Sequence, residues 1–165
     1  TGVAGGTIRD VVLGRVPNSI VDPAYVIATI ASGIVIFLLY SKLKKHWNLF
    51  LKFDAIGLGV FTIIGATFAY NIFGLNFLAI LLAGILTAVG GGVLRDVFVN
   101  QSPIVFVKEF YLTASFIGIV IFSILLYFTE EIYVATIIGI ILTTALRLIA
   151  IKYNWNLPKV KNTDS

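Results

Sequence analysis

The sequence predicts an all-α polytopic membrane protein that contains an inverted repeat and a final membrane-spanning helix. Composition is the first reason: 59% of the residues are apolar and 12% are charged, whereas soluble domains carry about 25% charged residues. The mean hydropathy is correspondingly high, at +1.02. The second reason is a series of apolar stretches long enough to cross a bilayer. The third is a glycine-rich motif with an Arg-Asp pair, which occurs twice.

The two motifs define the repeat. Residues 2–10 align with residues 88–96 at one constant offset, and Pro17 and Tyr25 then fall on Pro103 and Tyr111. A single Gly-Gly-x-x-Arg-Asp string would be a weak signal. Two copies in matching surroundings indicate a duplicated unit.

The first repeat is represented by residues 1 to about 47. Residues 1–15 are predicted to be the second part of a helix interrupted at Gly5-Gly6, and Pro17 ends this part. A span over about 24–40 follows, closed by a basic stretch. Because the chain starts inside a helix and without Met, we expect upstream sequence that includes the first half of that helix.

The second repeat covers residues from about 53 to 128. Asp54 is predicted to be the N-cap of a span over about 55–70. A helix over about 77–99 carries the second motif and is expected to be interrupted at its glycines. A span over about 110–128 and a final helix over about 132–151 complete one transmembrane domain, residues 1–151. Residues 152–165 form a polar tail.

Charge in the short loops predicts the orientation. Lysines of the 42–52 loop lie on the same side as Lys108 and the tail, whereas Glu130 and Glu131 lie on the opposite side; Arg15 is the exception. The positive-inside rule places the C-terminus in the cytosol. The chain crosses the membrane twice between the two motif helices, so these helices run antiparallel and the duplication is inverted.

Several function classes are disfavoured. The chain has no cysteine and one histidine, His46, which disfavours disulfides, thiol catalysis, metals bound by cysteine and any metal site other than one for a transient permeant cation. It contains no P-loop, zinc-protease motif or nucleophile with a neighbouring base, so we expect no enzyme and no cofactor. The basic residues flank apolar spans, which points to lipid partners and away from nucleic acid.

The motifs allow two interpretations each. The glycines either kink the helices and expose backbone to an aqueous path, or let two helices pack closely. The Arg-Asp pairs are either charged gates at two mouths of a pore or structural ion pairs. Adjacent residues point about 100° apart on a helix, so each arginine is expected to pair with a carboxylate on another helix. The candidate pore and gating residues are Gly5, Gly6, Arg9, Asp10, Gly90, Gly91, Gly92, Arg95 and Asp96.

Other polar residues give weaker signals. Thr87, Thr113 and Ser115 are candidates for lining the path, although hydroxyls in membrane helices often bond to their own backbone carbonyls. Arg147 is interpreted as an anchor that snorkels to the membrane surface, or as a pore or subunit contact. Lys108 and Arg147 are candidates for binding lipid phosphate.

The chain resembles the trimeric intracellular cation (TRIC) channel family, in its bacterial and archaeal branch, long described as glycine-transporter-like membrane proteins. The resemblance rests on both glycine motifs, Asp54-Ala55-Ile56-Gly57, Lys108-Glu109-Phe110-Tyr111, Arg147-Leu148 and Trp155-x-Leu157-Pro158. It implies a seven-helix protomer of two inverted three-helix repeats plus a last helix, with the first helix absent from this sequence. It further implies a homotrimer in a prokaryotic cell membrane, with one pore per subunit that passes monovalent cations, potassium above all and sodium.

Three functions remain open at this point. The first is a cation channel whose two kinked helices enclose the path. The second is a secondary transporter of glycine or another small amino acid, because an interrupted helix offers amides and carbonyls to a zwitterion. The third is a packing scaffold or lipid-binding protein. The inverted repeat serves the first two equally well.

Overall fold

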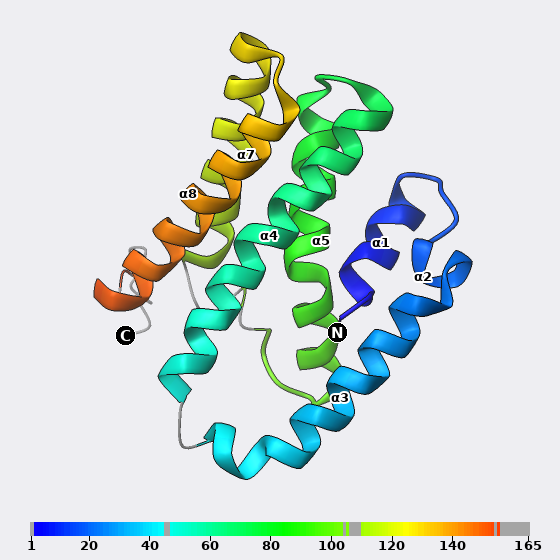
Figure 1. The fold of residues 1–165 in the computed structure, drawn as a ribbon, viewed down its shortest axis with the longest axis vertical. Helices are drawn as coiled ribbons and strands as arrows, with labels where there is room; N and C mark the ends of the chain where they lie inside the picture. Colours follow the sequence, from blue (N-terminus) through cyan, green and yellow to red (C-terminus); the bar gives the residue numbers. More distant parts are fainter. Residues whose placement is uncertain (1, 45–46, 104, 106–109, 154, 156–165) are drawn as a thin grey trace, which may run out of the picture.

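The computed structural model describes residues 2–44, 47–103, 105, 110–153 and 155, and the described residues contain helices and no strand. Figure 1 shows α4 and α5 in the middle of the molecule, α7 and α8 on one side, and α1, α2 and α3 on the other. The helices are α1 (Ala4–Val12), α2 (Asn18–Val21), α3 (Pro23–Lys44), α4 (Trp47–Phe73), α5 (Phe77–Phe98), α7 (Phe110–Thr129) and α8 (Ile132–Tyr153).

The lengths of the apolar helices fit a bilayer. Among the described residues, four helical segments are long and apolar enough to span it, namely Leu51–Phe73, Phe77–Phe98, Phe110–Thr129 and Ile132–Tyr153. A 22-residue helix such as α5 is about 33 Å long, which matches the hydrocarbon thickness. The apolar part of α3, Pro23–Leu39, is shorter, and most of its large side chains are exposed. The chain is an integral membrane protein.

Small residues set the packing of α4, α5, α7 and α8. A side-chain carbon added at Gly59 would meet Ile140 and Thr144 of α8, and one added at Gly84 would meet Thr62 of α4. Within lipid the hydrophobic effect does not drive helices together, so their association depends on van der Waals packing, which close backbone approach improves. The same helices enclose the buried core cluster Ile63, Ala66, Ala69, Ile80, Ala83, Ile119, Phe122, Leu126 and Ala135.

The motif helices α1 and α5 run antiparallel, as Figure 1 shows, so the predicted inversion of the repeat is confirmed. In the second copy the predicted interruption is wrong, because α5 is helical through residues 90–92. In the first copy, Gly5-Gly6 lie in the first turn of α1, which begins at Ala4. In both copies, the missing glycine side chain allows α1 and α5 to approach closely. A side-chain carbon on Gly5 would overlap the carbonyl oxygen of Thr87, and one on Gly90 would lie 3.2 Å from the Cα of Gly5.

The repeat extends to the way both motif helices end. Gly14 and Asn100 occupy matching positions and both have positive φ, 69° and 54°. The next amide in each copy bonds back to the aspartate carbonyl: Arg15 N to Asp10 O at 2.8 Å, and Gln101 N to Asp96 O at 2.8 Å. Both α1 and α5 therefore end in a Schellman motif. Each cap turns the chain away directly after an Arg-Asp pair.

The N-cap predicted for Asp54 is wrong. Helix α4 begins at Trp47, so Asp54 lies in the third turn, where a carboxylate no longer meets free backbone amides. The residues between Trp47 and Asp54 are mostly large and apolar and carry no glycine or proline to end a helix. The side chain of Asp54 accepts a hydrogen bond from the Tyr111 hydroxyl on α7 at 3.3 Å.

Candidate functional site

A cavity of about 630 Å³ lies between α1, α4 and α5, and both glycine motifs line it. Helix α1 contributes Gly5, Gly6 and the first Arg-Asp pair, and α5 contributes Gly91, Gly92 and the second pair. Helix α4, which belongs to the second repeat, forms a further wall. Two sequence segments that were recognised only as copies of each other therefore face one space.

Of the twelve predicted pore and pore-lining residues, nine line this cavity and three do not. Gly90 is buried against Gly5 at the crossing of α1 and α5. Ser115 is buried outside the cavity wall, with its hydroxyl 3.0 Å from that of Thr62. Thr113 is also outside the wall, whereas Thr87 lines the cavity. The roles of these residues in conduction remain predictions.

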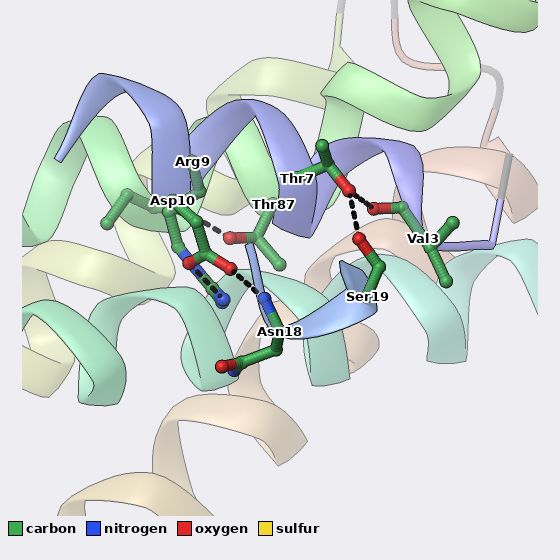
Figure 2. A network of polar contacts seen from close by, with 8 residues as sticks. Val3, Thr7, Arg9, Asp10, Asn18, Ser19 and Thr87 are labelled. Atoms are coloured by element: carbon green, nitrogen blue, oxygen red, sulfur yellow. Dashed lines mark hydrogen bonds and ion pairs between the residues drawn. The ribbon is translucent and has the colours of Figure 1, made fainter. Parts of the chain in front are cut away.

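In the first Arg-Asp pair, the two neighbouring side chains bind each other. Nε and Nη2 of Arg9 donate to Oδ1 of Asp10 at 2.8 and 2.7 Å, and both residues are buried. The second carboxylate oxygen of Asp10 accepts from the backbone amide of Asn18 at 3.0 Å, which ties the start of α2 to α1. Figure 2 shows Asp10 between Arg9 and Asn18. The carboxylate therefore neutralises the arginine and positions α2 at once.

The second pair repeats the first. Nε of Arg95 donates to Oδ1 of Asp96 at 2.8 Å. The Arg95 side chain is 40% exposed, whereas that of Arg9 is 6% exposed. In each copy a glycine stands beside the guanidinium: a side-chain carbon on Gly6 or Gly92 would lie 3.8 or 3.9 Å from the arginine Nη2. The residue matching Asn18 is number 104, outside the described residues.

Pairing with the neighbouring aspartate corrects the prediction of pairing between helices. The angle between adjacent Cβ atoms does not fix where an arginine ends, because its long side chain folds back along the helix. A guanidinium in a low-dielectric site gains most from the nearest carboxylate. One face of the Arg9 guanidinium lies over the ring of Phe68 on α4, with Cζ 3.9 Å from the ring centroid.

Hydroxyl groups add polar surface to the cavity. The Thr7 hydroxyl bonds to Val3 O at 2.9 Å and shares a hydrogen bond of 2.8 Å with Ser19. Thr87 donates to Ala83 O at 2.6 Å, which leaves its oxygen lone pairs available to a cation. Within the described ranges, no three His, Cys, Asp or Glu side chains gather to hold a metal ion.

Arg147 does not snorkel. Only 4% of the residue is exposed, and its guanidinium lies over the ring of Tyr111, with Cζ 4.9 Å from the centroid. The same tyrosine bonds to Asp54, so α4, α7 and α8 meet at this cluster. The sequence could not show which face of the last helix is covered. Lys108, the other predicted lipid contact, is outside the described residues.

Comparisons with known proteins place the chain in a family. A protein-family model described as glycine transporter matches residues 1–41 and 51–127. The UPF0126 inner membrane protein YadS of Escherichia coli strain K12 is 35% identical over 161 residues, 96% of this chain and 77% of that protein. A solved structure that concerns conductance through TRIC cation channels is 34% identical to this chain. The TM-score is 0.88, and the match covers 99% of this chain and 80% of the channel chain.

The chain belongs to the prokaryotic TRIC channel family. The TRIC trimeric intracellular cation channel orthologue from Rhodobacter sphaeroides gives a TM-score of 0.85 at 31% identity, over 93% of this chain and 79% of that chain. The predicted family and the all-α fold are thereby confirmed. In this TRIC chain, the two Arg-Asp pairs and the cavity between them are the features from which a function can be argued.

Proposed function

We propose that the chain is a cation channel, with potassium as the main permeant ion, and that ions pass through the cavity between α1, α4 and α5. One observation carries the proposal: a single cavity is lined by both Arg-Asp motifs of an inverted repeat. In inverted-repeat membrane proteins the ion and substrate sites lie at the interface of the two copies, and this cavity lies at that interface. Membership in the TRIC family supports the same function.

The charges of the cavity agree with cation passage. Two arginines and three aspartates are among the residues that line it, so the formal charge of the described lining is negative. Each arginine is held by the aspartate that follows it, at 2.7 to 2.8 Å. A paired guanidinium repels a cation much less than an isolated one, because the carboxylate cancels most of its field. Hydroxyl and backbone oxygens are then the groups that meet the ion.

The proposal includes assembly and orientation. We place the protein in a prokaryotic cell membrane as a homotrimer with one pore per subunit and a cytosolic C-terminus. The lysine distribution supports this orientation, and the Rhodobacter sphaeroides orthologue is described as trimeric. A cavity bounded by the helices of one protomer fits one pore per subunit.

Transport of glycine or another small amino acid is the second candidate. The matching family model is described as a glycine transporter, and the cavity is several times larger than a glycine molecule. The uninterrupted helix α5 weakens this alternative, since the predicted substrate site depended on backbone amides freed by an interruption.

Flux measurements in liposomes that contain the purified protein separate the two candidates. A potassium gradient is used to generate a membrane potential, and uptake of labelled glycine is followed in the same preparation. A non-saturating potassium flux that is independent of glycine supports the channel. Saturable glycine uptake with little potassium flux would mean that the protein is a transporter.

A further inference from the structure

The stack of Arg9 on Phe68 joins the two repeats across the cavity. Arg9 lies on α1 in the first repeat, and Phe68 lies on α4 in the second. Cζ of Arg9 is 3.9 Å from the ring centroid, and both residues line the cavity. Helix α1 packs mainly against α5, so this contact ties it to another wall of the same space.

The guanidinium of Arg9 is enclosed on three sides. Asp10 holds one edge, the Phe68 ring covers one face, and Gly6 stands beside Nη2 with no side chain of its own. Although Arg9 and Asp10 line the cavity, only 5% and 1% of these residues are exposed. Arg9 and Asp10 therefore form the wall of the cavity on the side of α1, its α1 end, and present almost no exposed surface there.

An aromatic ring suits a reversible contact. A second carboxylate would bind the guanidinium strongly and permanently in a low-dielectric site, whereas a ring face attracts it weakly. The Asp10 pair keeps the charge neutralised while the guanidinium leaves the ring, because the two residues are adjacent on α1. The side chain of Arg9 can therefore swing without separating an ion pair inside the membrane.

We propose that Phe68 positions Arg9 across the α1 end of the cavity, and that the stacked Arg9 closes this end to the permeant cation. This inference rests on the proposed channel function. Phe68 is a positioning residue, since it acts through the arginine. Replacing the ring by an aliphatic side chain of similar bulk shifts the ratio of stacked to unstacked Arg9 by about tenfold, equivalent to about 1.4 kcal/mol.

The test is a set of single-channel recordings in planar bilayers with symmetrical potassium chloride. Phe68→Leu removes the ring face and keeps most of the volume, so the open probability is expected to rise by up to about tenfold. Phe68→Trp offers a stronger ring face and lowers it. Phe73→Leu is the matched control, because Phe73 lies on the same helix outside the cavity wall, and it leaves the recordings unchanged.

A double-mutant cycle assigns the effect to the arginine. In an Arg9→Gln background the cation at 3.9 Å from the Phe68 centroid is gone and only Arg15 remains over the ring, with Cζ at 5.6 Å, so adding Phe68→Leu has a much smaller effect than in wild type. An equal effect of Phe68→Leu in both backgrounds would overturn the proposal, as would a Phe68→Leu channel identical to wild type. If Phe68→Leu does not fold, a Phe68→Trp channel that opens more than wild type overturns it. Wild-type protein without potassium current would instead refute the proposed function.

Discussion

Gly5 and Gly6 are neighbours in one motif, yet alanine is expected to act oppositely at the two positions. A side-chain carbon on Gly5 would lie 2.9 Å from Leu86 O and overlap Thr87 O. Both are backbone atoms of α5, which cannot rotate away, so α1 and α5 must separate. A side-chain carbon on Gly6 would lie 3.8 Å from the flexible Nη2 of Arg9, an ordinary contact.

The magnitudes follow from two opposing effects. Replacing glycine by alanine inside a helix stabilises it by up to about 1 kcal/mol. Overpacking a close helix contact costs about 1–3 kcal/mol. Gly6→Ala therefore stabilises the protein. Gly5→Ala gains the same helix propensity, but the overpacking of α1 against α5 outweighs it and the protein is destabilised. The difference between the two variants isolates the packing cost of about 1–3 kcal/mol, which corresponds to a separation of about 2–12 °C in unfolding temperature.

The assay is thermal unfolding of both variants in the same detergent, followed by potassium flux in liposomes. Gly5→Ala is expected to unfold at the lower temperature and to alter the flux, because the α1–α5 crossing forms a wall of the cavity. Equal unfolding temperatures for the two variants would refute the inference that Gly5 is required by a close helix crossing.

Three further predictions concern single side chains. Arg95→Ala alters the potassium current while the oligomer seen by size-exclusion chromatography is unchanged, because Arg95 lines the cavity and is partly exposed; unchanged currents contradict its role. Gly14→Ala destabilises the protein by about 1–2 kcal/mol and lowers its unfolding temperature, because φ at this position is 69°. Asn100→Gly is neutral or stabilising, because glycine adopts positive φ without strain. An unchanged unfolding temperature for Gly14→Ala would refute the role of Gly14 in the cap. Arg147→Lys destabilises the protein more than Tyr111→Phe does, because lysine loses the planar stacking on Tyr111 whereas phenylalanine keeps the ring. The reverse order of unfolding temperatures would contradict a stabilising stack of Arg147 on Tyr111.

The sequence predicts the duplicated architecture well because the repeat is visible in residue identities. Arg9 matches Arg95, and their helices do run antiparallel across a shared cavity. The matched caps at Gly14 and Asn100 were also accessible in principle, since glycine and asparagine are the two residues that best adopt positive φ at a helix end. Their alignment at one offset is the signal.

The state of the glycine segments could not be predicted from sequence. A run such as residues 90–92 permits either an interrupted helix or a close crossing, and the choice depends on which helix lies opposite. The structure decides for the crossing, because Gly90 meets Gly5. Local pairing of Arg9 with Asp10 was missed for a similar reason, since side-chain torsions are not encoded in residue spacing.

The positions of Asp54 and Arg147 depend on three-dimensional packing. On an all-apolar helix, periodicity does not show which face is buried. Arg147 therefore resembled an exposed anchor, and Asp54 resembled a cap ahead of an apolar run. Tyr111 connects the two, and its alignment with Tyr25, which also lines the cavity, was the available signal.

The central claim is that potassium passes through the cavity between α1, α4 and α5, and the absence of cysteine from the sequence allows a direct measurement. Thr87→Cys places a thiol of similar size in the cavity wall, and Ser115→Cys places one in the buried interior outside it. A positively charged thiol reagent is applied during potassium current recordings, and labelling is verified by mass spectrometry. The account predicts that current through Thr87→Cys is blocked and current through Ser115→Cys is unchanged. Full current through Thr87→Cys, whether labelled or not, would contradict it.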